Sequence, residues 1–148
     1  MLYYTHGVKK MKVKELNTGD WFTDNTHYWI KTEFDGKYYT LNMDNSRLFG
    51  SLGTIPENTE VNFVSSHNVV LPRHRERRLC PIQYAPVLEP LYDTKTNDVM
   101  VLRYFNDELH YAIVSTIWEH EIGVWRPIEK PNDFVRITST FEYQVCEE

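Results

Sequence analysis

The strongest local signal in this sequence is the dipeptide Asp35-Gly36, which lies between two runs rich in aromatic and β-branched residues, HYWIKTEF and KYYTLNM. Strands favour such residues because their side chains pack well on a pleated surface. Asp-Gly accepts the positive φ angles that a type I′ turn requires at both central positions, and this turn joins antiparallel strands through two residues. The sequence therefore predicts a β-hairpin over residues 27–43, which commits this half of the chain to an antiparallel sheet.

A second segment of the chain, MVLRYFNDELHYAIVS at residues 100–115, repeats the order of this hairpin. With one inserted residue, the matched positions are Phe34 with Phe105, Asp35-Gly36 with Asn106-Asp107, Tyr39 with Tyr111 and Leu41 with Ile113. After each hairpin, a glycine, an isoleucine, a proline and an acidic residue precede another predicted strand. We interpret this pattern as duplication of a unit of about 50 residues. Chance similarity is the alternative, because identity is low and the alignment needs gaps.

The 148 residues then divide into four segments: an N-terminal arm (1–12), a first β unit (13–65), a basic connector (66–83) and a second β unit (84–148). Stretches with helical spacing are too short to form helices that are stable alone. We therefore predict a mainly β fold with two tandem small units of about five strands each, either β-barrel-like or β-sandwich. Units of this size bury little apolar surface alone, so we expect the copies to pack on each other or on another chain. On this basis we expect a homo-oligomer.

The connector contains the sequence RHRERR at residues 73–78, which carries +3 in a chain whose net charge is −5. Its arginines are Arg73, Arg75, Arg77 and Arg78. Pro72 and Pro81 bound the segment, and proline interrupts strand pairing and favours extended backbone. We interpret the segment as a solvated connector outside both units; a binding arm for an anionic partner is the alternative.

Sequence motifs for catalysis, cofactors and metals are absent. No P-loop, dinucleotide-binding glycine motif or nucleophile elbow occurs, and His120-Glu121 lacks the second histidine of the H-E-x-x-H zinc motif. The six histidines are scattered, and Cys80 and Cys146 lack zinc-ligand spacing. Paired carboxylates occur at predicted turns and at the C-terminus, where such groups are usually solvated. We therefore predict no enzymatic activity, no cofactor and no metal site.

The compartment is indicated by what the chain lacks. No run of 18 uncharged apolar residues is present, and the first ten residues, MLYYTHGVKK, do not contain the apolar core of a signal peptide. We therefore expect an intracellular protein that does not insert into a membrane.

The alternation of side chains along the predicted hairpin defines a candidate binding surface. If Ile30 faces the core, then Trp29, Lys31 and Tyr38 lie on the opposite face. An exposed tryptophan and tyrosine beside a lysine are typical of a protein-interface anchor or of a base-stacking platform. The alternative is that this face is also buried, by the other copy or by a neighbouring chain. For two further tryptophans, Trp118 and Trp125, we expect core positions; the alternative is that they supply a separate apolar anchor.

The segment KVKELNTGDWF, followed by YWIKT and YYTLN, resembles small accessory proteins encoded by tailed bacteriophages. In these proteins a K-x-x-x-L-x-x-G-x-x-F opening precedes a strand of this kind, and the likeness covers residues 11–64. The resemblance implies a protein that occupies a host protein or sequesters a nucleotide signal. The shared positions are turn and strand residues, so the resemblance assigns no functional residue.

Our leading hypothesis is a non-enzymatic phage-type binding protein that inhibits or occupies a host protein in the cytoplasm of the host cell. A defence or nucleic-acid-processing enzyme is a suitable target, because a chain that is acidic outside residues 73–78 complements a basic, DNA-binding surface.

Two alternatives stay open. One is an oligomeric sponge that holds an anionic nucleotide between the arginines of residues 73–78 and aromatic rings, because arginine contacts phosphate bidentately and rings stack on bases. The other is a nucleic-acid-binding accessory protein, which the negative net charge opposes. Its contacts would come from the arginines together with Lys9, Lys10, Lys12 and Lys14.

Overall fold

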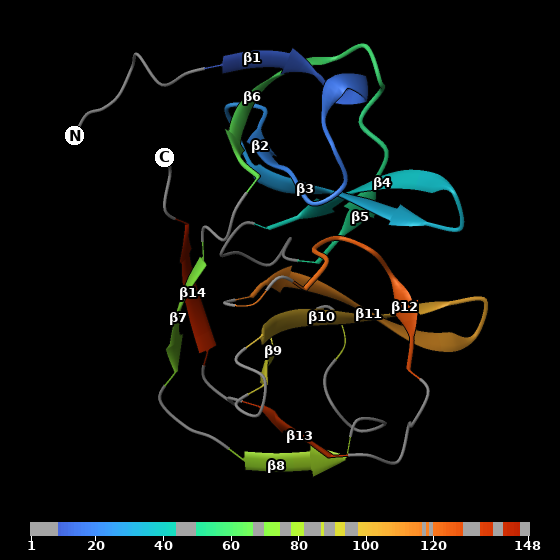
Figure 1. Cartoon of the computed structure of the whole chain (residues 1–148), viewed down its shortest axis with the longest axis vertical. Coiled ribbons are helices and arrows are strands. Elements are labelled where there is room, and N and C mark those ends of the chain that lie inside the picture. The colour runs from blue at the N-terminus through green and yellow to red at the C-terminus, as the bar shows by residue number, and fades with distance from the viewer. Residues whose placement is uncertain are drawn as a thin grey trace.

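The computed structural model describes residues 9–43, 50–66, 70–74, 78–81, 87, 91–93, 98–116, 118, 120–128, 134–137 and 141–145. Within these residues the backbone forms fourteen strands, β1–β14, and one short 3-10 helix (Figure 1). The described part of the chain contains no α-helix. The prediction of a mainly β protein is therefore confirmed.

The first sheet is antiparallel and comes entirely from the first half of the chain, in the order β1-β6-β2-β3-β4-β5. Its strands are β1 (Lys9–Lys12), β2 (Trp21–Thr23), β3 (Tyr28–Phe34), β4 (Lys37–Asn42), β5 (Leu52–Gly53) and β6 (Glu60–Ser65). The predicted hairpin is β3–β4, in which Phe34 pairs with Lys37. Its two turn residues, Asp35 and Gly36, have φ angles of 52° and 77°. Positive values at both positions are those that the Asp-Gly sequence predicted.

The start of the chain requires a correction. We expected residues 1–12 to form an arm outside the core, but Lys9–Lys12 is strand β1, which pairs with β6, and residues 1–8 lie outside the described part. The 3-10 helix Val13–Glu15 follows directly, and Val13 is fully buried. The lysines obscured the pattern, because only Met11 and Val13 carry its apolar signal.

The second sheet comes from the second half of the chain and has the order β12-β11-β10-β9. Its strands are β9 (Leu91–Asp93), β10 (Asp98–Phe105), β11 (Glu108–Ser115) and β12 (Arg126–Pro127). The β10–β11 turn also has two residues at positive φ, Asn106 (50°) and Asp107 (65°).

Because both turns have the same length, the inserted residue in our alignment of the two hairpins was wrong. Tyr39 pairs with Thr32 in the first hairpin, and His110 pairs with Arg103 in the second. Tyr39 therefore corresponds to His110 and not to Tyr111.

The basic segment also differs from its expected role. Val70–His74 forms β7, which pairs with β14 (Phe141–Val145), and Arg78–Pro81 forms β8, which pairs with β13 (Phe134–Ile137). The expectation of a solvated connector outside both units is wrong for these two stretches. Each is one strand of a two-stranded ribbon, and every strand of such a ribbon has an open edge that tolerates proline. The domain boundaries themselves stay a prediction.

The strand order supports the interpretation of a duplicated module. In the first half, β2–β5 form a meander, β6 returns beside β2, and β1 pairs with β6. In the second half, β9–β12 form the same meander, β13 lies beside β9, and β8 pairs with β13. In this comparison β8, which carries Arg78, corresponds to β1.

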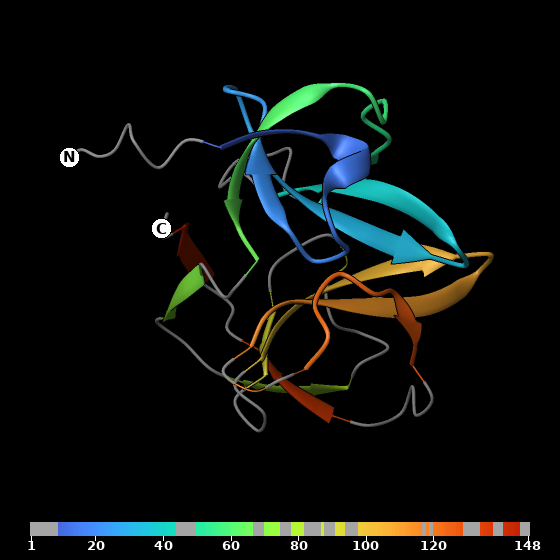
Figure 2. The ribbon, with the colours of Figure 1, turned by 45° about the horizontal axis from the view of Figure 1, so that its top comes forward.

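The two sheets pack face to face and share one apolar core, with the β8–β13 ribbon on the far side of the second sheet (Figure 2). The buried members are Trp21, Ile30, Leu41, Met43 and Val64 from the first sheet and Val99, Val101, Ala112, Val114 and Trp125 from the second half. Phe34 and Phe105, which our alignment matched, stack with ring centroids 4.1 Å apart. The arrangement is a sandwich, and the expectation that the copies pack on each other is confirmed.

A short segment, residues 122–125, ties the two sheets together at the backbone. Gly123 donates its N–H to the carbonyl of Ile113 in the second sheet at 2.9 Å and accepts from the N–H of Glu33 in the first sheet at 2.8 Å. Trp125 donates its N–H to the carbonyl of Glu33 at 3.0 Å and its indole N–H to Thr32 Oγ1 at 2.9 Å. The loop that follows β11 is therefore fixed to both layers.

Candidate functional site

The predicted aromatic face is not a free surface. Trp29, Lys31 and Tyr38 are all half-buried, and Trp29 and Tyr38 pack against a second apolar cluster built on Val13 and Phe22. The Tyr38 hydroxyl donates a hydrogen bond to the carbonyl of the loop residue Ile55 at 2.7 Å. The expectation of an exposed platform is wrong, because β1, which we expected to be part of an external arm, and the 3-10 helix that follows it contribute to this cluster.

Lys31 has a structural role on this face. Its ammonium donates to the carbonyls of Val13 at 3.0 Å and Leu16 at 2.7 Å, and it lies 5.3 Å from the centre of the Tyr38 ring. Burial lowers the pKa of Lys31, while the charge of Asp20 acts in the opposite direction. The ammonium therefore satisfies carbonyls at the end of the 3-10 helix and is not available to a partner.

The four predicted arginines are only partly placed. Arg73 lies in β7 opposite Glu142, and Arg78 lies in β8 opposite Ile137. Arg75 and Arg77 lie outside the described residues. The backbone thus places Arg73 and Arg78 in two different ribbons, and a nucleotide site built from this cluster stays a prediction.

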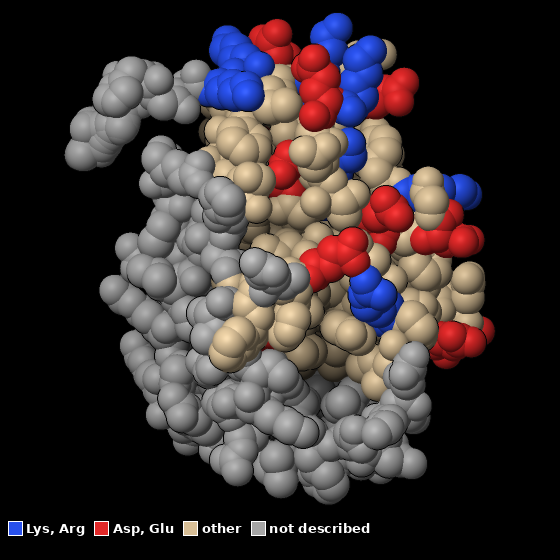
Figure 3. Space-filling model, in the orientation of Figure 1, with Lys and Arg blue, Asp and Glu red and all other residues tan. Residues whose placement is uncertain are grey.

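The N-terminal lysines lie on an edge strand with acidic neighbours. Lys10 Nζ is 3.9 Å from a carboxylate oxygen of Glu60, and Lys9 Nζ lies 5.9 Å from the centre of the Phe63 ring. Basic side chains gather over β1 and the 3-10 helix, with acidic ones interleaved (Figure 3). This mixture does not form the uniform basic surface that nucleic-acid binding favours.

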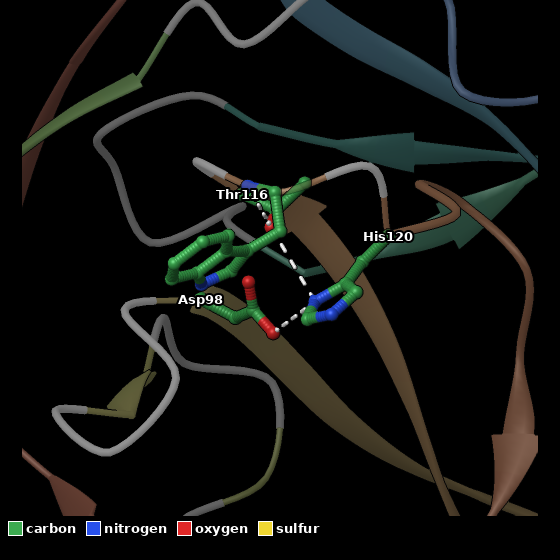
Figure 4. A network of polar contacts seen from close by, with 4 residues as sticks. Asp98, Thr116 and His120 are labelled. Carbon is green, nitrogen blue, oxygen red and sulfur yellow. Dashed lines mark hydrogen bonds and ion pairs between the residues drawn. The ribbon is translucent and has the colours of Figure 1, made fainter.

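Sequence reasoning missed a polar network at one end of the second sheet (Figure 4). Asp98, at the start of β10, is buried, and its Oδ2 lies 2.9 Å from Nδ1 of His120. Thr116 Oγ1 lies 3.5 Å from the same nitrogen and accepts a hydrogen bond from the backbone N–H of Trp118 at 3.0 Å. The His120 side chain is 46% exposed, whereas that of Asp98 is 5% exposed. A buried carboxylate therefore fixes a solvent-facing imidazole.

This contact also fixes the tautomer of the neutral imidazole. The Asp98 carboxylate accepts a hydrogen bond from the N–H at Nδ1, which leaves Nε2 as a hydrogen-bond acceptor. Nε2 points away from both Asp98 and Thr116 (Figure 4). Asp98 and His120 are 22 residues apart in the chain, so no local sequence pattern indicates that they pair.

The loop residue Trp118 is 56% exposed, so the expectation of a core position is wrong for it. The same expectation is confirmed for Trp125, which is buried with its indole N–H bonded to Thr32. Both tryptophans lie in the connection between β11 and β12, and hydropathy alone does not show which of them is buried. We call residues 116–121 the Trp118 loop; its described members are Thr116, Trp118, His120 and Glu121.

The chemistry of this network is limited. A nucleophilic triad requires the hydroxyl at the ring nitrogen that the carboxylate does not occupy, but Thr116 and Asp98 both contact Nδ1 of His120. Within the described residues, no group of three or more His, Cys, Asp or Glu side chains is arranged to hold a metal ion. The arrangement is suited to holding the Trp118 loop in one conformation and presenting an acceptor nitrogen beside it.

A search of the described residues finds no helix with the length and apolar character needed to cross a bilayer. Comparisons with protein-family profiles, with curated proteins and with solved structures give no match.

Proposed function

We propose that this protein is a non-enzymatic binding protein that attaches to another protein through the Trp118 loop. The observation that carries the proposal is the exposure of Trp118, at 56%, in a loop that is hydrogen-bonded on both sides. In keeping with the resemblance to accessory proteins of tailed phages, the partner is a protein of the infected bacterial cell.

A tryptophan held in this way has the properties of an interface anchor. Tryptophan is enriched among the few residues that dominate binding energy, because its ring removes a large apolar area from water. Before Trp118 in the chain, the Thr116 hydroxyl accepts a hydrogen bond from the Trp118 N–H; after it, His120 contacts Asp98 and Gly123 is bonded to both sheets. Ordering a loop on binding opposes association, so a loop that is already ordered binds more tightly.

The test is capture of a partner from bacterial lysate by the tagged protein and by two variants, Trp118→Ala and Tyr104→Ala. Tyr104 is also 56% exposed but lies in β10, outside the Trp118 loop, so it is a matched control for the loss of an exposed aromatic ring. We expect a stoichiometric partner that the wild type and Tyr104→Ala retain and that Trp118→Ala loses, with equal melting temperatures for all three. Capture that does not depend on Trp118, or no stoichiometric partner at low and at moderate salt, would refute the proposal.

The structure also changes the expected effect of a substitution at Trp29, which the sequence placed on an exposed binding face. Since Trp29 packs against the cluster of Val13 and Phe22, Trp29→Ala should lower the melting temperature and should not act selectively on binding.

A further inference from the structure

We propose that the Trp118 loop receives an arginine side chain of a basic partner protein. This inference rests on the proposed function and adds to it the chemistry of the partner. Three features of the loop support it: an exposed aromatic face, an acceptor nitrogen, and local negative charge.

The aromatic face is that of Trp118. A cation over an indole ring is attracted by the negative face of the π-system, and tryptophan is the best of the aromatic residues in this role. Guanidinium is planar and weakly hydrated, so it stacks on such a ring more readily than a lysine ammonium does. The exposed indole therefore favours arginine over lysine.

The acceptor is Nε2 of His120. The hydrogen bond from Nδ1 to Asp98 leaves Nε2 without a proton in the neutral imidazole, and no hydrogen bond to Nε2 occurs within the described part of the chain. Arginine carries five N–H donors and no acceptor, so it matches this nitrogen. Trp118 and His120 are two residues apart, which places their Cα atoms within about 7 Å of each other. A partner that carries arginine therefore meets both side chains within one short stretch of the loop.

The negative charge of the loop also favours binding of an arginine. The sequence Trp118-Glu119-His120-Glu121 contains two carboxylates and no basic residue apart from the histidine. Glu121, whose side chain is 63% exposed, already binds the guanidinium of Arg126. The chain as a whole carries −5, which attracts a basic partner over longer distances. This pair offsets one of the two negative charges of the loop, and the net negative charge of the chain still favours a cationic side chain.

The experiment measures the affinity of the full-length protein for a hexa-arginine peptide and a hexa-lysine peptide by calorimetry at matched salt. The two peptides have the same charge, and Trp118→Ala leaves the charge of the protein unchanged, so long-range attraction is constant across the comparison. We expect hexa-arginine to bind the wild type more tightly than hexa-lysine. Trp118→Ala should weaken hexa-arginine binding by about two- to thirty-fold and remove the difference between the peptides. Tyr104→Ala should behave as the wild type does.

Equal affinities for the two peptides, or an unchanged affinity in Trp118→Ala, would overturn the inference. If the lysate experiment still gives a partner that depends on Trp118, the proposed function stands and only the arginine chemistry falls. Sedimentation of the protein alone tests a second copy as the occupant, since this chain carries its own arginine cluster. A homodimer that Trp118→Ala dissociates would overturn the assignment to a different protein, and a sedimentation coefficient unchanged by the substitution supports it.

Discussion

Gly123→Ala should be among the most destabilising single-methyl additions in the described part of the chain. Gly123 has a φ angle of +84°, and a Cβ atom there would lie 2.9 Å from the carbonyl oxygen of Lys31 and 3.0 Å from the backbone nitrogen of Gly19. Both neighbours are backbone atoms of the first sheet and its adjoining turn, so no side-chain rotation relieves the contact. The added methyl must push the 122–125 segment away from the sheet.

The expected loss in free energy of unfolding has two parts. A left-handed backbone conformation costs an L-residue about 1–2 kcal/mol. Moving the segment also lengthens the hydrogen bonds that Gly123 makes with Ile113 at 2.9 Å and Glu33 at 2.8 Å, each worth about 1 kcal/mol. We therefore expect Gly123→Ala to lower the free energy of unfolding by about 3–4 kcal/mol, a large part of the stability of an ordinary domain.

Gly36 supplies the matched control. It also has a positive φ, +77°, but a Cβ atom there would meet nothing within 4 Å. Gly36→Ala thus reports the backbone term alone, about 1–2 kcal/mol, and the difference between the variants reports the contact between the sheets. Equilibrium unfolding in urea, followed by tryptophan fluorescence, measures both. Equal destabilisation by the two substitutions would refute the idea that this crossing holds the sheets together.

Three other substitutions test the surrounding polar contacts. Lys31→Met should lower the free energy of unfolding by about 1–3 kcal/mol in a urea titration, because it removes the ammonium donor to the carbonyl of Leu16 and one of two donors to the carbonyl of Val13. Lys37→Met, in the same hairpin but exposed, is the control and should change little. Trp125→Phe should cost about 1–3 kcal/mol, since it removes the buried bond to Thr32 and part of a core ring, and a loss below about 0.5 kcal/mol would contradict this role. Burial raises the pKa of Asp24, but hydrogen bonds from the residues that follow it outweigh burial and lower the pKa. Asp24 therefore contributes stability above the unfolded pKa of about 3.9 that is lost as the pH falls through the folded value, and the urea midpoints of wild type and Asp24→Asn should converge on acidification.

The parts of the fold that the sequence predicted are those fixed by local chemistry. A two-residue turn needs positive φ at both positions, and Asp35-Gly36 and Asn106-Asp107 both provide it. Alternation along β3 correctly assigned Ile30 to the core, and the alignment of the two hairpins correctly placed Phe34 and Phe105 at the same position before each turn. Each of these features depends on residues a few positions apart or on a simple period.

The parts that the sequence did not predict depend on contacts between distant segments. Trp29 and Lys31 share the face opposite to Ile30 as expected, but whether that face meets water is decided by the 3-10 helix at Val13, which alternation in β3 does not record. The pairing of Asp98 with His120 joins the start of β10 to a loop after β11. Neither spacing nor composition distinguishes such a pair from solvated surface residues.

The edges of the two larger sheets are poorly suited to pairing with another chain. An open edge strand invites pairing with another chain, and proteins prevent this with lysines, short strands or proline. Edge strand β1 carries three lysines among its four residues, and the opposite edge, β5, has two residues. In the second sheet, β12 is two residues long and contains Pro127, which lacks an N–H, and β9 has three residues.

Apolar clusters also lie on the outer faces of both sheets. The cluster with Val13 covers the first, and a third apolar cluster, with Leu91 and Leu102, lies on the second. On the two larger sheets, side chains that project from the sandwich are therefore the better candidates for contact with another chain. Among the exposed large apolar residues there, Val87, Tyr104 and Trp118, it is Trp118 that lies in a loop fastened to a buried carboxylate and to both sheets. A binding surface needs an exposed apolar group and a rigid support together, and in the described residues this combination occurs at the Trp118 loop.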